Sequence, residues 1–321
     1  MSGPVTTTDV SAAPEPEAPE PSGVEVLDDR VAQVGGLTVR RALPKRGRRT
    51  VGPWCFLDHF GPASLDEAAM RVGPHPHIGL ATVTWVVEGE VLHRDSLGTE
   101  QLVRPGQLNL MSAGRGVAHA EESPAGATGS LHGVQLWVAQ PEATRTGAPA
   151  FEHHAALPVV ELDGGAVATV VVGELAGARS PARADHPAVA LDLSLPAATA
   201  EAALPLAPAF EHALVVLDGA VLVEGAVVEP GRLAHLGPGH AGAHLAAAGI
   251  PARVLLVGGS PFPFPPVMWW NFVGRTREEV AAAREDWVAG SDRFGAVGSP
   301  LDRIAPPGLP WSPTGMGGSS Q

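Results

Sequence analysis

The 321-residue chain is predicted to be an all-β protein of two barrels, with one short helix near its C-terminal end. Short apolar runs alternate with glycine and proline, of which the chain contains 39 and 32, and this pattern is typical of short strands and tight turns. The segments around Gly89 and Gly219 resemble each other, which indicates two copies of one β unit. Hydrophobic residues make up 45% of the chain, enough for one large domain or two of ordinary size.

The internal repeat covers several turns and the strands beside them. The first copy reads WVVEGEV and then VRPGQLNLMSAGRGVAHAE, and the second reads LVVLDGAV and then VEPGRLAHLGPGHAGAHLA. Aligning the Pro-Gly pairs at 105–106 and 230–231 places His119 on His244 without a gap. At three other positions the second copy has no polar residue: His75 falls on Pro205, His77 on Ala207 and Glu121 on Ala246. The second copy is therefore predicted to have kept the turns and lost a polar cluster.

Four segments are predicted along the chain. Residues 1–23 are rich in Pro, Glu, Ala and Thr and are expected to be disordered. The N-terminal barrel is assigned to residues 24–142 and the C-terminal barrel to residues 150–265, with the turn-rich stretch QPEATRTGAP at the boundary. Residues 266–321 are expected to form the helix and a tail.

The helix is expected in the stretch TREEVAAAREDW. Thr276 is followed three residues later by Glu279, and this pair is a capping box that marks the start of a helix. Val280, Ala283 and Trp287 recur at helical spacing, so these side chains are expected to face the core.

Charge and cysteine content exclude several classes of protein. The net charge is −13, and the basic stretch PKRGRR at 44–49 is expected to be a solvated loop, so direct nucleic-acid binding is not expected. Cys55 is the only cysteine, which excludes an intrachain disulfide and a cysteine-based zinc site. No uninterrupted apolar stretch reaches about 20 residues, and the start lacks the pattern of a signal peptide. We expect a cytoplasmic monomer with no membrane partner.

The stretch GPHPHIGLATVTW places two histidines at the start of an apolar run. His75 and His77 are two residues apart, so on a strand both side chains point to the same face. If the strand stays regular, Val83, Trp85 and Val87 share that face and line the same interior. A bulge at Gly79 would reverse this parity.

His119 and Glu121 have the same spacing just after a glycine-rich turn. Two neighbouring strands that each contribute two inward ligands would form a site of three histidines and one glutamate. This set of ligands suits Fe, Mn, Co, Ni, Cu or Zn, and an incompletely filled coordination sphere is typical of a catalytic site. Either pair alone is weak evidence in a chain with 13 histidines, but both pairs in one half of a repeat predict a metal site.

Several other polar or aromatic residues allow two interpretations. His59 and His93 could support the metal ligands or could be turn histidines bonded to the backbone. Arg115 could meet an anionic substrate or form a surface ion pair. His132 is expected in the core, and Trp269 and Trp270 are expected to pack against the terminal helix rather than to bind substrate.

Long motifs in the chain resemble the pirin family. They are PHPHIGLATVTWVVEGEVLHRDSLG and RPGQLNLMSAGRGVAHAEES, with FLDHFGP before them and MWWNFVGRTREEVAAAREDW after them. The resemblance implies a bicupin, in which two cupin β-barrels lie face to face and the N-terminal barrel holds one metal ion, usually iron. It also implies that His75, His77, His119 and Glu121 are the ligands and that the C-terminal barrel has no metal. Many cupins carry a glutamate where this chain has Ala81, but that residue is not a ligand in pirins.

The resemblance implies a dioxygenase of the quercetin 2,3-dioxygenase type that acts on a flavonol and O2. Fe(II) is the first candidate for the metal, with Mn, Ni, Co, Cu or Zn as alternatives. Glu121 is expected to accept the proton of the flavonol hydroxyl as that oxygen binds the metal. The alternative is a non-catalytic, iron-bearing regulatory protein that binds a protein partner according to the oxidation state of the metal.

Overall fold

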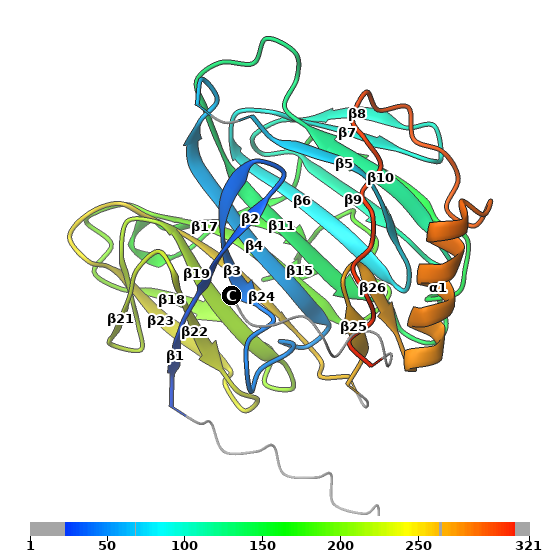
Figure 1. Ribbon diagram of the computed structural model, residues 1–321. Helices are drawn as coiled ribbons and strands as arrows, with labels where there is room; N and C mark the ends of the chain where they lie inside the picture. The colour runs from blue at the N-terminus through cyan, green and yellow to red at the C-terminus, as the bar shows by residue number, and fades with distance from the viewer. Residues whose placement is uncertain (1–22, 68, 263–264, 312–321) are drawn as a thin grey trace, which may run out of the picture.

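The computed structural model describes residues 23–67, 69–262 and 265–311 of the chain. Within this part of the chain there are two barrels, each made of a larger and a smaller antiparallel sheet, and Figure 1 shows them side by side. The predicted all-β architecture with a helix near the C-terminal end is confirmed. Residues 1–22 of the segment predicted to be disordered, and the end of the tail from residue 312, lie outside the described residues.

The N-terminal barrel contains the first copy of the repeat. Its larger sheet has the strand order β12-β9-β6-β11-β4-β3-β2, and its smaller sheet has the order β5-β10-β7-β8. The strands are β2 (Arg30–Val34), β3 (Leu37–Leu43), β4 (Trp54–Ser64), β5 (Arg71–His77), β6 (Leu80–Glu88), β7 (Val91–Asp95), β8 (Glu100–Val103), β9 (Leu108–Ser112), β10 (Val117–Glu122), β11 (Ser130–Ala139) and β12 (Ala150–His154).

The C-terminal barrel has an equivalent layout. Its larger sheet has the order β1-β22-β19-β24-β17-β14-β13, and its smaller sheet has the order β18-β23-β20-β21. The strands are β1 (Glu25–Asp28), β13 (Val159–Glu161), β14 (Val167–Val172), β17 (Ala188–Leu195), β18 (Ala202–Pro205), β19 (Glu211–Asp218), β20 (Val221–Val223), β21 (Ala226–Val228), β22 (Arg232–Leu236), β23 (Gly242–Ala247) and β24 (Ala252–Gly259).

The two larger sheets exchange their edge strands. Strand β1 comes from the start of the described chain, yet it pairs with β22 of the C-terminal barrel. Strand β12 follows the predicted boundary, yet it pairs with β9 of the N-terminal barrel. The larger sheet of the C-terminal barrel therefore ends with β1, which precedes the whole N-terminal barrel in sequence. The larger sheet of the N-terminal barrel ends with β12, which follows the linker.

The short elements lie at the ends of the barrels. They are η1 (Asp163–Gly165), the β15 (Glu174–Leu175) and β16 (Ala178–Arg179) hairpin, the β25 (Val267–Trp269) and β26 (Phe272–Gly274) hairpin, and α1 (Arg277–Ala289). The predicted helix is confirmed, because Thr276 is its N-cap and accepts a hydrogen bond from the backbone N–H of Glu279 at 3.2 Å. Val280, Ala283 and Trp287 are its buried residues, as predicted. In the described chain, no helix has both the length and the apolar character needed to span a membrane.

The two larger sheets pack against each other through an apolar layer. Val83 and Trp85 of β6 lie in this layer together with Val215 and Val257 of the C-terminal barrel. The indole N–H of Trp85 donates to Asp192 Oδ2 at 2.9 Å across the interface. The prediction that Val83, Trp85 and Val87 line the same interior as the histidines is therefore wrong.

The reversal arises at the corner between β5 and β6, which lie in different sheets of one barrel. Gly79 sits at this corner with a φ of +65°, a left-handed conformation that favours glycine. A Cβ at this position would lie 2.1 Å from the carbonyl oxygen of Val273, so no other residue fits. The turn flips the parity, and Thr84 rather than Trp85 points into the N-terminal barrel, where its hydroxyl contacts Glu121.

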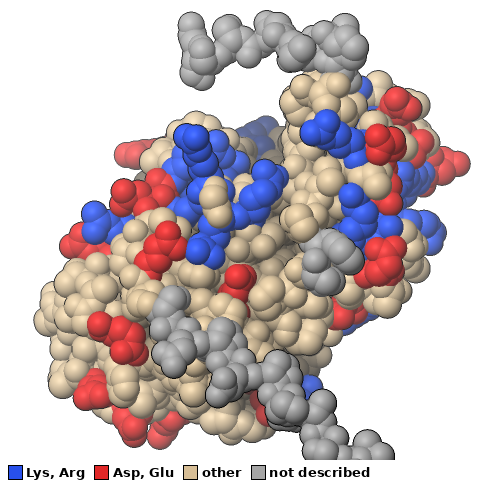
Figure 2. Space-filling model, turned by 90° about the horizontal axis from the view of Figure 1, so that it is seen from below, with Lys and Arg blue, Asp and Glu red and all other residues tan. Residues whose placement is uncertain are grey.

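Surface charge is mixed on the face shown in Figure 2. Lys and Arg side chains gather there in groups with Asp and Glu side chains beside them. Ion pairs of the described residues follow the same pattern. Arg94 contacts Glu100 and Glu122, and Arg145 contacts Glu142 and Glu279.

Candidate metal centre and its cavity

Strands β5 and β10 bring the predicted histidines together. The two strands are antiparallel neighbours, and their register pairs His119 with His75 and Val117 with His77. The Nε2 atoms of His77 and His119 are 3.0 Å apart. One ring nitrogen from each of the three histidines lies within 4.8 Å of the others, and all three side chains are buried.

Hydrogen bonds fix the orientation of these rings. The Nδ1–H of His75 donates to the carbonyl oxygen of Gly73 at 2.9 Å, and that of His77 donates to the carbonyl oxygen of Asn271 at 3.0 Å. A neutral imidazole carries one proton, so the Nε2 atom of each ring is left as a lone pair. Such second contacts are the usual way in which a protein sets the tautomer of a metal-binding histidine.

His93 and Asp95 of β7 set the orientation and the tautomer of the His119 ring. His93 Nε2 lies 3.2 Å from Asp95 Oδ2, and its Nδ1 lies 3.4 Å from His119 Nδ1. Because the carboxylate only accepts, a neutral His93 donates from Nε2 and accepts at Nδ1, and His119 then donates from Nδ1. His93 also stacks on Phe151 of β12, with ring centroids 4.7 Å apart. Of the two interpretations of His93, the structure supports contact with a predicted ligand.

These tautomers leave the lone pairs of His77 Nε2 and His119 Nε2 facing each other at 3.0 Å. Two lone pairs at this distance repel each other unless a cation lies between or beside them. Burial also keeps the rings neutral: it lowers the pKa of His75 to about 4 and the pKa values of His77 and His119 well below the ordinary range. Neutral imidazole is the form that binds metals, so the three histidines fit a divalent transition metal.

Glu121 lies beside this centre. One of its carboxylate oxygens groups with His93 and His119, within 4.8 Å of a ring nitrogen of each, so the structure shows two overlapping triads that share His119. Burial raises the pKa of the Glu121 carboxyl. The hydroxyl of Thr84 lies 3.0 Å from Glu121 Oε1 and 2.9 Å from Gln135 Oε1. Since Thr84 has one proton to donate, a protonated Glu121 would complete a chain from Glu121 through Thr84 to Gln135.

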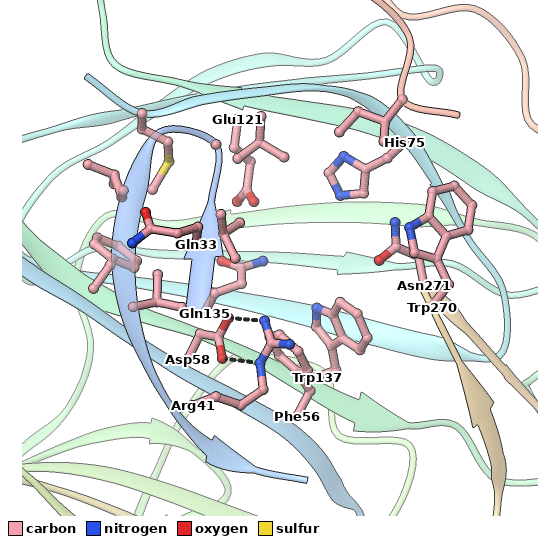
Figure 3. A pocket seen from close by; sticks show the side chains of 18 residues that line it. Gln33, Arg41, Phe56, Asp58, His75, Glu121, Gln135, Trp137, Trp270 and Asn271 are labelled. Atoms are coloured by element: carbon pink, nitrogen blue, oxygen red, sulfur yellow. Dashed lines mark hydrogen bonds and ion pairs between the residues drawn. The ribbon is translucent and has the colours of Figure 1, made fainter. Parts of the chain in front are cut away.

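The centre opens into a cavity of about 430 Å³ inside the N-terminal barrel (Figure 3). This volume lies within the range of small-molecule sites. His75 and Glu121 line one end, and the ion pair of Arg41 and Asp58 lines the other. The walls between them carry aromatic side chains, of which Phe56, Trp137 and Trp270 are labelled in Figure 3.

Sequence reasoning missed the polar floor of this cavity. Arg41, Asp58 and Gln135 line it from β3, β4 and β11, and Thr84 of β6 continues the same row beside Gln135. Thr84 and Gln135 each lie between buried apolar neighbours on their strands, and this alternation was the available signal, whereas Arg41 follows Arg40 and Asp58 precedes His59. It could not be used without knowing which strands are neighbours and which face is the inside.

The other singled-out residues have mixed outcomes. His59 and His132 form a buried pair with Nε2 atoms 2.8 Å apart, outside the cavity lining, and burial lowers the pKa of His59 to about 3. Arg115 is exposed and does not line the cavity. Trp269 and Trp270 pack near the helix as predicted, but Trp270 also lines the cavity.

The gapless alignment of the two repeats is wrong by one residue in this region. His244, which the alignment places on His119, is exposed on β23, whereas its neighbours Ala243 and Leu245 are buried. A slip of one residue along a strand moves a side chain to the opposite face. The inward positions of the second barrel are therefore apolar throughout this strand.

Comparison with known proteins identifies the family. The pirin family model matches residues 36–138, and the model of the pirin C-terminal cupin domain matches residues 190–295. A Pirin-like protein of Caulobacter vibrioides is 38% identical over 83% of this chain and 93% of its own. The chain belongs to the pirin family. The two barrels are accordingly the two cupin domains of a pirin.

Two other relatives carry the name of an activity. "Putative quercetin 2,3-dioxygenase PA1205" of Pseudomonas aeruginosa is 46% identical over 88% of this chain and 89% of its own. The 1.78 Å crystal structure of quercetin 2,3-dioxygenase from Acinetobacter baumannii is 42% identical, covers 90% of this chain and 96% of its own, and has a TM-score of 0.84. These relatives share nearly the whole fold with this pirin.

Proposed function

We propose that this pirin is a metal-dependent dioxygenase that cleaves a flavonol such as quercetin with O2. The single observation that carries the proposal is the buried cluster of three histidines, which lies at one end of a partly aromatic cavity. The names of the two relatives at 46% and 42% identity support the same activity.

In this proposal His75, His77, His119 and Glu121 hold one divalent ion, and Fe(II) is the ion we propose. When bound, the ion supplies a Lewis acid that orients the flavonol oxygens and can engage O2. Glu121 accepts the proton of the flavonol hydroxyl, and Thr84 holds the carboxyl of Glu121 through a 3.0 Å contact. The aromatic walls bind the flat rings and exclude water.

The experiment is elemental analysis of the purified protein coupled to O2 uptake with quercetin. We expect about one transition-metal ion per chain and quercetin-dependent O2 consumption that chelation abolishes and Fe(II) restores. A protein that retains the metal but consumes no O2 with any flavonol would contradict the proposal.

A further inference from the structure

Arg41 and Asp58 form an ion pair in the wall of the cavity, remote from the histidines. Arg41 donates from Nε to Asp58 Oδ1 and from Nη2 to Asp58 Oδ2, both at 2.7 Å. The side chains are only 18% and 5% exposed. The fold does not require this pair, since the same sheet positions of the C-terminal barrel carry Val170 and Leu191 opposite each other. Apolar residues often replace a buried ion pair without loss of stability.

The pair lies at a defined distance from the predicted metal ligands. Thr84 contacts Glu121, and Gln135 separates Thr84 from Asp58 in one row across β6, β11 and β4. Two strand spacings separate Thr84 from Asp58, which is about 10 Å. Figure 3 likewise shows Arg41 and Asp58 at the opposite end of the cavity from His75 and Glu121. A ligand that reaches both ends therefore needs two rings rather than one.

The hydrogen-bonding capacity of the pair favours a donor on the ligand. Each oxygen of Asp58 accepts one hydrogen bond from Arg41, and a carboxylate oxygen can accept a second. The pair is neutral as a whole, and the other acidic side chain on the cavity lining is that of Glu121. An acidic group on the ligand would meet two acidic side chains, whereas a neutral hydroxyl could donate to Asp58.

The aromatic wall holds the pair in place beside a flat surface. The guanidinium of Arg41 lies over the ring of Phe56, 4.6 Å from its centroid. Phe56 in turn stacks on Trp137, with centroids 4.0 Å apart and planes 15° apart, and Trp137 meets the ring of His77 edge to face. This stack runs from the ion pair to a predicted metal ligand and offers a planar ring a continuous wall.

We propose that Arg41 and Asp58 select the substrate by the ring remote from the metal. The preferred ligand is a neutral polyphenol of two linked ring systems, whose second ring carries a hydroxyl that donates a hydrogen bond to Asp58. This inference rests on the proposed function, because it assumes that the flavonol oxygens face the histidine cluster.

The test measures binding without turnover. Quenching of tryptophan emission is followed in metal-loaded protein without oxygen, with three flavonols that share one metal-binding end. Kaempferol has a 4′-hydroxyl on the second ring, galangin has none, and kaempferide has the hydroxyl methylated. We expect kaempferol to bind about 10- to 100-fold more tightly than either, the usual effect of one hydrogen bond to a charged group.

Two variants locate the preference. Asp58→Asn should reduce it, and the double variant Arg41→Val with Asp58→Leu, which copies the C-terminal barrel, should bring the ratio of dissociation constants near one. The matched control is Arg104→Met, which removes the exposed pair of Arg104 and Glu90 and should keep the wild-type ratio. Equal binding of the three flavonols, a preference that survives the double variant, or no binding at all would overturn the inference.

Readmitting oxygen separates the two proposals. A hydroxyl preference in binding without O2 consumption would support the role of Asp58 and contradict the dioxygenase. Turnover of all three flavonols with equal affinities would leave the dioxygenase standing and contradict the role of Asp58.

Discussion

The two barrels have the same strand order but different interiors. One row of side chains crosses the larger sheet at equivalent positions in each. In the N-terminal barrel the row reads Arg41, Asp58, Gln135, Thr84, Asn109 and His153, and in the C-terminal barrel it reads Val170, Leu191, Leu256, Leu214, Ala234 and Val26. The first row is polar at every position, and the second is apolar at every position.

The difference shows how one backbone layout can carry either a polar or an apolar row inside the barrel. Leu191, Leu214 and Leu256 belong to the apolar core cluster of the C-terminal barrel. Burial of each such side chain contributes about 1.5–3 kcal/mol. The N-terminal barrel forgoes this stabilisation along its row, and Arg41, Asp58 and Gln135 of that row line its cavity.

The largest expected effect is the loss of the metal from the N-terminal barrel. His119→Ala removes the ring shared by both triads, so metal content should fall from about one ion per chain to near zero. Quercetin-dependent O2 uptake should fall by more than about 100-fold, the upper range for loss of a contact that only supports a ligand. The matched control is His244→Ala, which the sequence alignment pairs with His119 but which lies exposed in the other barrel. Equal loss in both variants would contradict this distinction between the barrels.

The second effect places a charge in the apolar row. Leu191→Asp copies Asp58 into the C-terminal barrel, where the opposite residue is Val170 and offers no counter-charge. The free energy of unfolding, measured by urea denaturation, should fall by about 3–5 kcal/mol. Val227→Asp on the exposed face of the same barrel should change it by less than about 0.5 kcal/mol. Similar losses in the two variants would show that the interior is not closed to water.

The third effect tests the contacts behind His119. In Asp95→Asn the amide N–H would face His93 Nε2, so His93 would protonate at Nδ1 and His119 at Nε2, the atom that faces His77. Metal affinity, measured by competition with a chelator, should fall by about 10- to 100-fold. Asp95 also accepts backbone N–H groups of Leu97 and Thr99 through its other oxygen, which asparagine retains. Unchanged affinity would exclude this role of His93.

The smallest effect concerns stability in acid. Here the two barrels are similar, because each contains a buried histidine whose pKa is lowered, His59 in the N-terminal barrel and His212 in the C-terminal barrel. Burial lowers the pKa of His212 in the C-terminal barrel to about 4. The unfolded chain then binds a proton near pH 6.5 that the folded chain does not, so stability is full above pH 6.5 and falls as the pH drops toward 4. Between pH 7 and pH 5 the metal-free wild type should lose roughly 2 kcal/mol more unfolding free energy than His212→Leu. Between pH 8 and pH 7 the two should change equally, and parallel curves throughout would contradict the shift.

The sequence predicts this comparison in outline but not its detail. The spacing of two residues between His75 and His77, and between His119 and Glu121, located the cluster. Residues two apart on a regular strand share a face, and this rule needs no knowledge of the other strands. The capping box at Thr276 located the helix for a similar reason, since capping depends on local geometry alone.

The errors lie where one residue of register decides the face. The turn at Gly79 moved Trp85 to the inter-barrel layer, and a one-residue slip placed exposed His244 on His119. The role of Asp58 depends on pairing with Arg41 and Gln135 from strands far along the chain. Such long-range pairing leaves no pattern within a single segment.

The crossed edge strands affect how the chain can be made. During synthesis β1 emerges first, but its partner β22 emerges some 200 residues later, and the N-terminal barrel lacks β12 until the linker is complete. Neither half can finish its sheet while the other is missing. An expression clone cut at the linker would therefore leave β1 without a partner and expose the unpaired edges of β9 and β22, which invite aggregation.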